Sequence, residues 1–141
     1  MLKYQLLHPE ILAALGGAGH GAKVLIADGN YPFSTRAAPH AKRVYLNLAP
    51  GMLNVTDVLR VVAAAIPVES AAVMVPESGE EPPIHQEFRR ILPSDVPIKT
   101  LGRFDFYDAA RDPDTALVIA TGEQRIYANI LLTIGVVPPP G

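Results

Sequence analysis

The chain has 141 residues, of which 49% are hydrophobic, a formal net charge of −2 and no cysteine. This length and apolar content are enough for a buried core, so residues 1–141 are expected to form a single domain. The near-zero charge gives no sign of the basic surface that nucleic-acid binding requires, so we expect no nucleic-acid partner. The lack of cysteine excludes disulfides, thiolate metal sites and cysteine nucleophiles.

The apolar residues are mostly aliphatic, and they do not gather into a membrane segment. No apolar run approaches the ~18 residues that predict a membrane span, and the N-terminus lacks the pattern of a signal peptide. We therefore expect a cytoplasmic location. The mean hydropathy of +0.21 is high for a chain in which only 6% of residues are aromatic. Some apolar surface is thus expected to be buried between the subunits of a homo-oligomer.

Helical and extended segments alternate along the chain. Apolar residues at helical spacing predict helices over 9–15, 55–65, 84–92 and 104–110. Runs of branched apolar residues predict strands over 24–27, 43–48, 71–75, 97–101 and 116–120, and a last apolar segment covers 129–137. Pro9 suits the first turn of the first helix, and Asn54 suits the cap of the second. This alternation predicts an α/β domain in which helices cover a mostly buried sheet.

Two groups that can handle protons flank the first predicted strand. His20 lies between two glycines before this strand, and Asp28 follows its last residue. Ligands of open α/β sheets bind outside the carboxyl ends of strands, which favours Asp28 as a site residue, although an aspartate before Gly29 is also typical of a turn. The glycines would let the His20 ring face a cavity, but a histidine in such a loop is roughly as often an ordinary surface residue.

The glycine-rich loop over 16–21 does not predict a nucleotide site. A dinucleotide-binding loop follows a strand and opens a helix, whereas this loop follows a helix and opens a strand. The sequence has no Gly-Lys-Ser/Thr triplet, which excludes a P-loop. The other histidines, His8, His40 and His85, lack metal-ligand spacing, and no serine lies in a hydrolase motif. We therefore expect no metal and no cofactor.

Two later segments combine aromatic and polar side chains. Tyr127 and Asn129 are two residues apart, so they would lie on one side of an extended chain and offer an aromatic face and an amide to a sugar. Spacing alone favours a tyrosine packed on the core and an asparagine in a turn. Arg103 precedes Phe104 and Tyr107, which share a helical face in a way that is typical of packing.

Four blocks of the sequence, taken in order, resemble the D-ribose pyranase / L-fucose mutarotase family. The blocks are Gly19-His20-Gly21, Asp28-Gly29-Asn30-Tyr31-Pro32, Arg103-Phe104-Asp105-Phe106-Tyr107, and the stretch from Thr121 to Val136 that includes Tyr127-Ala128-Asn129. Any one block is weak, but four in order over nearly the whole chain are specific. The third block resembles the fucose mutarotase branch. The chain departs from the family at Ala22-Lys23 and in a longer connection over 111–114.

The resemblance implies a fold, an activity and a set of site residues. The fold would be a three-layer α/β/α sandwich with a mixed, mostly parallel central sheet, assembled into rings that stack as decamers with pockets near subunit contacts. His20 would be the proton-transferring residue. The residues expected to bind the monosaccharide are Asp28, Arg103, Tyr127, Ala128 and Asn129. The activity would be exchange between the α and β anomers of L-fucose or a related aldose by acid/base-catalysed ring opening.

Three alternatives to a mutarotase stay open from the sequence. A D-ribose pyranase of the same family would exchange pyranose and furanose forms of its sugar. A non-catalytic sugar-binding oligomer would need the same site, since a lone histidine does not guarantee catalysis. A small hydrolase that uses aspartate and histidine is the least supported, because no activated nucleophile is visible. The identity of the sugar and the proton-transfer partner of His20 also stay open.

Overall fold

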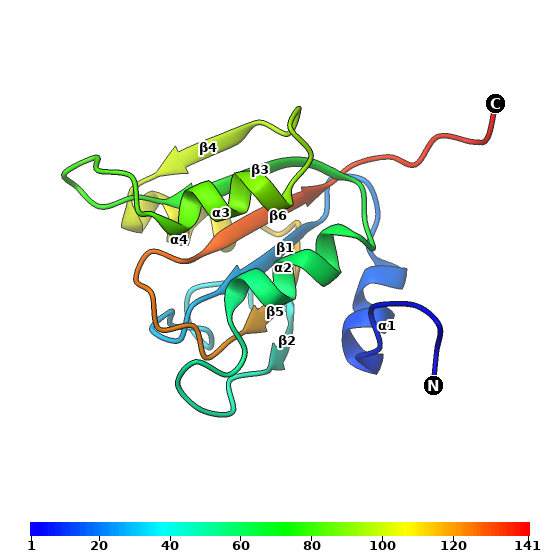
Figure 1. The fold of residues 1–141 in the computed structure, drawn as a ribbon, viewed down its shortest axis with the longest axis horizontal. Coiled ribbons are helices and arrows are strands. Elements are labelled where there is room, and N and C mark those ends of the chain that lie inside the picture. Colours follow the sequence, from blue (N-terminus) through cyan, green and yellow to red (C-terminus); the bar gives the residue numbers. More distant parts are fainter.

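A six-stranded mixed sheet forms the middle layer of the computed structural model, which describes residues 1–141 (Figure 1). In spatial order its strands are β2 (Lys42–Tyr45), β5 (Thr115–Ala120), β1 (Lys23–Ala27), β6 (Ile130–Ile134), β3 (Val68–Met74) and β4 (Ile98–Leu101). Five strands run parallel to one another, and β6 alone is antiparallel to its neighbours β1 and β3. The expected mixed, mostly parallel sheet is confirmed.

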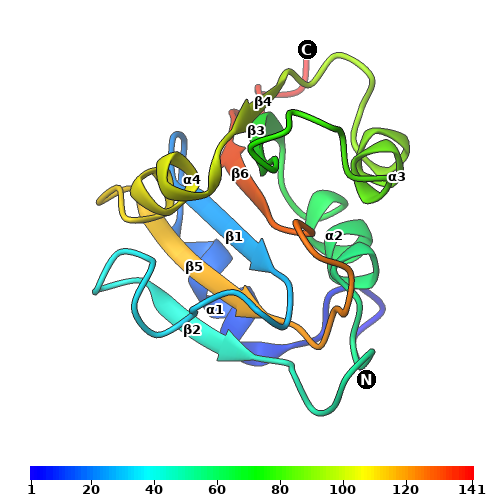
Figure 2. The same cartoon turned by 90° about the vertical axis from the view of Figure 1, so that its left-hand side faces the viewer.

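Four helices form the outer layers. Helices α1 (Pro9–Gly17), α2 (Val55–Ala63) and α3 (Ile84–Ile91) pack on one face of the sheet, where they contribute to the larger apolar cluster. Helix α4 (Arg103–Ala110) and the loop over 28–41 cover the other face with a smaller cluster. Figure 2 shows α4 on one side of the strands and α2 and α3 on the other. The expected three-layer α/β/α arrangement is also confirmed.

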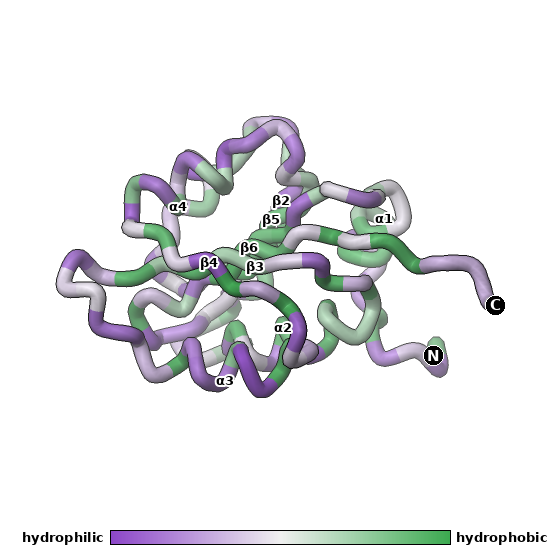
Figure 3. The backbone as a smooth tube through the Cα atoms, turned by 90° about the horizontal axis from the view of Figure 1, so that it is seen from above, coloured by the Kyte–Doolittle hydropathy of each residue, from purple (hydrophilic) through white to green (hydrophobic).

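Strand β1 lies in the interior of the sheet, and its residues alternate between the two apolar clusters. Val24 and Ile26 belong to the cluster under α1, α2 and α3, whereas Leu25 and Ala27 belong to the cluster under α4. All four side chains are fully buried. Successive residues of a strand point to opposite faces, so a continuous apolar run is required where both faces are covered. Figure 3 shows hydrophobic segments along the strands and hydrophilic ones along α3.

Residues at the helix starts explain where two helices begin. Pro9 occupies the first turn of α1, where its missing N–H has no intrahelical partner to lose. Asn54 precedes α2 as expected, and its N–H donates to the Asp57 carboxylate at 3.1 Å. An acidic group at this end also interacts favourably with the helix dipole. None of the helices is both long and apolar enough to cross a membrane.

Two strand boundaries differ by three residues from their predicted positions because strand pairing, rather than apolar patterning, sets strand length. Strand β3 begins at Val68, before the predicted start at residue 71, since it pairs with β6 as far as Ile134. Strand β2 ends at Tyr45, before the predicted end at residue 48, since its partner β5 ends opposite it at Ala120. Partners distant in sequence decide both boundaries.

The direction of β6 determines which loops meet. Strands β1, β3 and β5 end where β6 begins, so the loops after Ala27, Met74 and Ala120 lie at the same edge as the loop before Ile130 (Figure 1). We call this the carboxyl edge. At the opposite edge, which we call the amino edge, β1 and β3 begin and β6 ends. The predicted site residues divide between these two edges.

Candidate functional site

A hollow of about 330 Å³ opens at the carboxyl edge. This volume lies within the range of ~300–1,000 Å³ that is typical of small-molecule sites. Its lining includes four of the predicted site residues, Asp28, Arg103, Tyr127 and Asn129. The other lining residues are Asn30, Tyr31, Met74, Tyr107 and Ile126. Segments far apart in the sequence therefore converge on one small cavity.

Asp28 is buried at the end of β1, and hydrogen bonds hold both its backbone N–H and its carboxylate. Its N–H donates to the Asn129 Oδ1 atom at 2.7 Å, and its own carboxylate accepts the N–H groups of Asn30 at 3.0 Å and Ala128 at 3.2 Å. Burial raises the pKa of the Asp28 carboxyl above its ordinary value, while the donated N–H groups act in the opposite direction. The result is a carboxylate of fixed orientation beside a hollow.

Tyr127 adopts a backbone conformation that the sequence does not predict. Its φ of 57° lies in the left-handed region, which residues other than glycine rarely adopt. The expectation of an extended chain from Tyr127 to Asn129 is therefore wrong at its first residue, which lies in a turn before β6. The carbonyl of Tyr127 accepts a hydrogen bond from His85 Nε2 at 3.2 Å, and the following N–H, that of Ala128, donates to Asp28. Strained residues of this kind cluster at functional sites.

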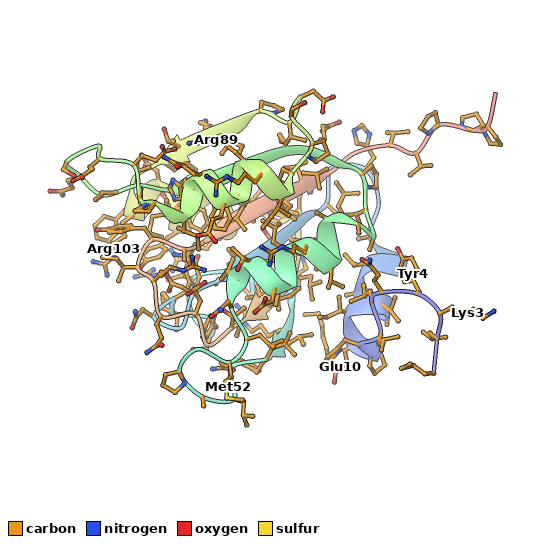
Figure 4. The ribbon with its side chains drawn as sticks, in the orientation of Figure 1. Lys3, Tyr4, Glu10, Met52, Arg89 and Arg103 are labelled. Atoms are coloured by element: carbon orange, nitrogen blue, oxygen red, sulfur yellow. The ribbon has the colours of Figure 1, made fainter.

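Arg103 brings a cation to the hollow from the first turn of α4. Its Nε donates to the Tyr107 hydroxyl at 3.1 Å, and its guanidinium lies 5.1 Å from the centroid of the Phe104 ring and 5.6 Å from that of Tyr107. These contacts leave its two terminal nitrogens without a hydrogen bond to the protein. Figure 4 shows Arg103 at the opposite end of the molecule from Tyr4 and Glu10.

Aromatic packing forms one wall of the hollow. Tyr31 and Tyr107 meet edge to face with ring centroids 5.4 Å apart, and Phe106 lies behind Tyr31 at 6.0 Å. The Tyr31 hydroxyl donates to the carbonyl of Arg36 at 2.6 Å, and burial raises its pKa far above the ordinary value, so the phenol stays protonated. The packing expected for Tyr107 is confirmed, and the same ring also lines the hollow.

The loop over 121–123 supports the loop that carries Asp28. Thr121 Oγ1 donates to the carbonyl of Ala27 at 2.7 Å, which ties the ends of β5 and β1 together. At Gly122 a Cβ atom would lie only 2.3 Å from the carbonyl oxygen of Ala49. No side chain fits there without a backbone shift, so glycine is required by the close approach of two loops.

Glu123 is a buried carboxylate that joins this loop to α2. It accepts the N–H of Val55 at 3.3 Å and an Arg125 Nη2–H at 2.8 Å, and Arg125 also pairs with Glu87. Burial alone would raise the pKa of the Glu123 carboxyl, but the hydrogen bonds from Arg125 and Val55 outweigh it and lower the pKa. Glu123 therefore stays ionised and anchors the start of α2 at the carboxyl edge.

His20 lies at the amino edge, far from the hollow. Its Nε2 donates to Glu69 Oε1 at 2.8 Å, and the two side chains are 58% and 50% exposed. The whole of β1, a span of roughly 16 Å for a strand of this length, separates His20 from Asp28. Within one protomer the ring faces a surface carboxylate instead of the cavity that its flanking glycines led us to expect. The structure thus brings together every predicted binding residue and leaves the predicted catalytic residue apart.

Sequence reasoning missed several residues that these arrangements reveal. Tyr31 lies in the same sequence block as Asp28, and Met74 lies near the end of the strand predicted over 71–75, so the rule that placed Asp28 could have found both. Glu69 and His85 gave no such signal. Each contacts its partner across more than 40 positions of sequence, from a strand and a helix of ordinary pattern.

Comparison with known proteins assigns the family. A model of the RbsD / FucU transport protein family matches residues 1–137. The chain belongs to this family. Fucose mutarotase of Danio rerio is 32% identical over 148 residues, which cover 95% of this chain and 92% of that protein. The family resemblance of the four sequence blocks is therefore confirmed.

Two solved structures related to this RbsD / FucU family member carry a sugar. RbsD of Bacillus subtilis complexed with D-ribose is 26% identical, and fucose mutarotase of Streptococcus pneumoniae in complex with L-fucose is 27% identical. Each superposes with a TM-score of 0.82 over 98% of this chain and 100% of the other. The likeness therefore extends over nearly the whole chain, including both edges of the sheet.

Proposed function

We propose that this protein is a mutarotase that interconverts the α and β anomers of L-fucose or a related aldose. The observation that carries the proposal is the hollow at the carboxyl edge, where a buried carboxylate, a guanidinium, an aromatic ring and an amide converge. A monosaccharide presents hydroxyl groups around a partly apolar ring, and these four groups offer acceptors, donors and an apolar face. The mutarotase relatives and the neighbour that binds L-fucose support the same substrate class.

The reaction opens and recloses a cyclic hemiacetal. A base takes the proton of the anomeric hydroxyl while an acid protonates the ring oxygen, and the bond between the anomeric carbon and the ring oxygen breaks to give the open-chain aldehyde. Rotation beside the aldehyde carbon, followed by reclosure with the two roles reversed, yields the other anomer. The positioned groups only move protons while the ring bond breaks and re-forms within the sugar, so the reaction consumes no oxidant and requires no covalent intermediate with the protein.

The residues of the hollow bind and orient the sugar in this proposal. Asp28 accepts hydrogen bonds from sugar hydroxyl groups with the lone pairs that its backbone donors leave free. Arg103 donates hydrogen bonds to the sugar from its terminal nitrogens. The Tyr127 ring covers the apolar face of the sugar. Ala128 contributes its N–H, which holds the Asp28 carboxylate, and Asn129 fixes the Asp28 backbone.

Proton transfer is assigned to His20 of a neighbouring copy of the chain. Glu69 engages Nε2 of this histidine and thereby leaves Nδ1 free to exchange a proton with the sugar. Because β1 separates the ring from the hollow of its own protomer, contact with a bound sugar requires that the amino edge of one copy meets the carboxyl edge of another. Glu69 is then the positioning partner of His20.

Assembly is part of the same proposal. Large apolar side chains stay exposed on the protomer, among them Leu48, Phe104, Ile126 and Val137. Two of them, Phe104 and Ile126, lie beside the hollow. Light scattering is expected to give the mass of the decamer that the family resemblance implies, whereas a monomer with full activity would contradict the shared site. The cytoplasmic location stays a prediction, which fractionation of producing cells checks.

Magnetisation-transfer NMR between the α and β anomers of L-fucose tests the function. The protein should accelerate the exchange, and His20→Ala should reduce it by about 10²- to 10⁴-fold, the usual contribution of a general acid/base. His40→Ala serves as the matched control, since His40 is an exposed histidine outside the hollow and the His20 loop. Equal exchange with and without the protein would refute the mutarotase function.

A D-ribose pyranase is the second candidate, because the RbsD neighbour that carries D-ribose matches this fold as well as the L-fucose complex does. The same NMR measurement with D-ribose, following exchange between pyranose and furanose forms, separates the two activities. Faster turnover of D-ribose than of L-fucose would favour the pyranase. Tight sugar binding in calorimetry without any accelerated exchange would instead indicate a non-catalytic binding protein.

A further inference from the structure

His85 is a buried histidine that lies behind the hollow rather than in it. Its side chain belongs to α3 and is 2% exposed, and its ring stacks on Phe88 with centroids 5.7 Å apart. The single hydrogen bond of the ring joins Nε2 to the carbonyl of Tyr127 at 3.2 Å. The histidine therefore contacts the turn that carries the sugar-facing ring without lining the hollow.

The hydrogen-bond partners fix the chemical form of this imidazole. A carbonyl oxygen only accepts, so Nε2 carries the hydrogen. The other ring nitrogen, Nδ1, is buried and has no partner. Burial lowers the pKa of His85 below its ordinary value, in agreement with a neutral ring. An apolar side chain of similar size would avoid the unpaired nitrogen, so packing alone does not account for an imidazole at this position.

The peptide group between Tyr127 and Ala128 explains what the imidazole does. Its carbonyl accepts from His85, and its N–H donates to the Asp28 carboxylate at 3.2 Å on the opposite side. One planar group is thus held from both ends, next to a residue with a φ of 57°. Without the His85 contact, this peptide group could rotate, which would turn its N–H away from Asp28 and release Tyr127 from its left-handed conformation.

We propose that His85 is a positioning residue, which locks the peptide group between Tyr127 and Ala128 so that the Tyr127 ring and the Asp28 carboxylate face the sugar. This proposal rests on the proposed function of the hollow. It links α3, which does not contact the sugar, to the two groups that do. His85 is not a catalytic residue here, since it does not line the hollow and its Nε2 is bound to the carbonyl of Tyr127.

Two substitutions separate this role from simple packing. His85→Leu removes the donor while it keeps an apolar side chain, and His85→Gln keeps an N–H near the position of Nε2. We expect His85→Leu to raise the KM for L-fucose about tenfold with a smaller change in kcat, since misplaced binding groups mainly weaken sugar binding. His85→Gln is expected to restore most of the affinity.

Leu92→Ala provides the control for lost packing. His85 and Leu92 both line a second cavity, of about 400 Å³, which is separate from the hollow. Leu92 is buried like His85, but it makes no hydrogen bond to the Tyr127 turn. Its truncation should lower the urea midpoint of unfolding and leave the KM unchanged. An unchanged KM in His85→Leu, or an equal rise in KM in Leu92→Ala, would overturn the positioning role.

A second measurement distinguishes failure of this proposal from failure of the proposed function. The amide proton of Ala128 donates to a carboxylate, so its NMR signal is expected at low field and its exchange with solvent is expected to be slow. In His85→Leu, but not in Leu92→Ala, the signal should move upfield and exchange faster. This result would support the positioning role of His85 even if the wild-type protein lacked mutarotase activity. An unaltered Ala128 amide signal in His85→Leu would refute that role even if the wild-type protein were an active mutarotase.

Discussion

The two edges of the sheet differ in how deeply their charged side chains are buried and in what holds them, although β1 joins the edges directly. At the carboxyl edge Asp28 is 3% exposed, and backbone amides fix its carboxylate. At the amino edge His20 and Glu69 form a pair whose side chains are 58% and 50% exposed. The hollow at the carboxyl edge has no histidine in its lining, and the imidazole of His20 lies at the amino edge. The contrast teaches that each edge supplies only part of the proposed site.

Mixing two inactive variants is the strongest test of this division. His20→Ala and Asp28→Ala should each lose most of the anomer exchange. When the two chains are produced together, about one quarter of the sites should pair an intact His20 with an intact Asp28, because the two residues come from different copies. Activity should therefore recover to a fraction of the wild-type value, measured by the same NMR exchange assay.

The matched control is a chain that carries both His20→Ala and Asp28→Ala and is produced as the only chain in the cell. None of its copies can supply an intact His20 or an intact Asp28, so this oligomer should stay inactive. If the mixed oligomer is as inactive as this control, His20 and Asp28 of the same chain must work together, and the assignment of His20 to a neighbouring copy is wrong.

Alanine at one glycine of each edge tests the difference in packing. Gly122→Ala places a methyl group 2.3 Å from a backbone carbonyl at the carboxyl edge, and the resulting shift should lower the free energy of unfolding by about 3 kcal/mol. Gly19→Ala meets no atom within 4 Å at the amino edge, and its effect should stay within about 0.5 kcal/mol. Urea unfolding measures both, and equal effects would contradict the contrast.

The smallest expected effect concerns the pH dependence of stability at the carboxyl edge. The pKa of Glu123 is lowered in the folded protein, so its contribution is present above the ordinary pKa of 4.5 and is lost as the pH falls through the lowered value. Glu123→Gln should therefore cost about 1–2 kcal/mol at pH 7, and the difference from wild type should shrink in acid. Glu80→Gln, at an exposed glutamate, should show no such difference in urea unfolding at either pH.

The fold and part of the site could be predicted from sequence because they depend on local patterns. The apolar run before Asp28 predicted β1, and the general rule for α/β sheets placed Asp28 at a ligand edge. Arg103 and the Tyr127–Asn129 stretch came from the family resemblance, since their spacing alone favoured packing. The resemblance therefore identified the site residues that belong to elements other than β1.

The remaining features depend on contacts between distant segments. The left-handed turn at Tyr127 contradicts the preference of tyrosine, and it is held in place by His85 from α3 and by Asp28 after β1. Glu69 meets His20 only because β3 and β1 flank the same antiparallel strand. Neither contact leaves a periodic signal in the sequence, so pattern analysis does not find them.

Strand β6 follows every other strand in the chain, yet it is inserted between β1 and β3. Without residues 130–134 the sheet would be divided into β2-β5-β1 and β3-β4, and β1 and β3 would each be an unpaired edge strand. Strand β6 thus joins the two parts of the sheet and also anchors the turn that completes the hollow. A chain that ends before β6 therefore lacks both a continuous sheet and the strand that holds the Tyr127 turn beside Asp28.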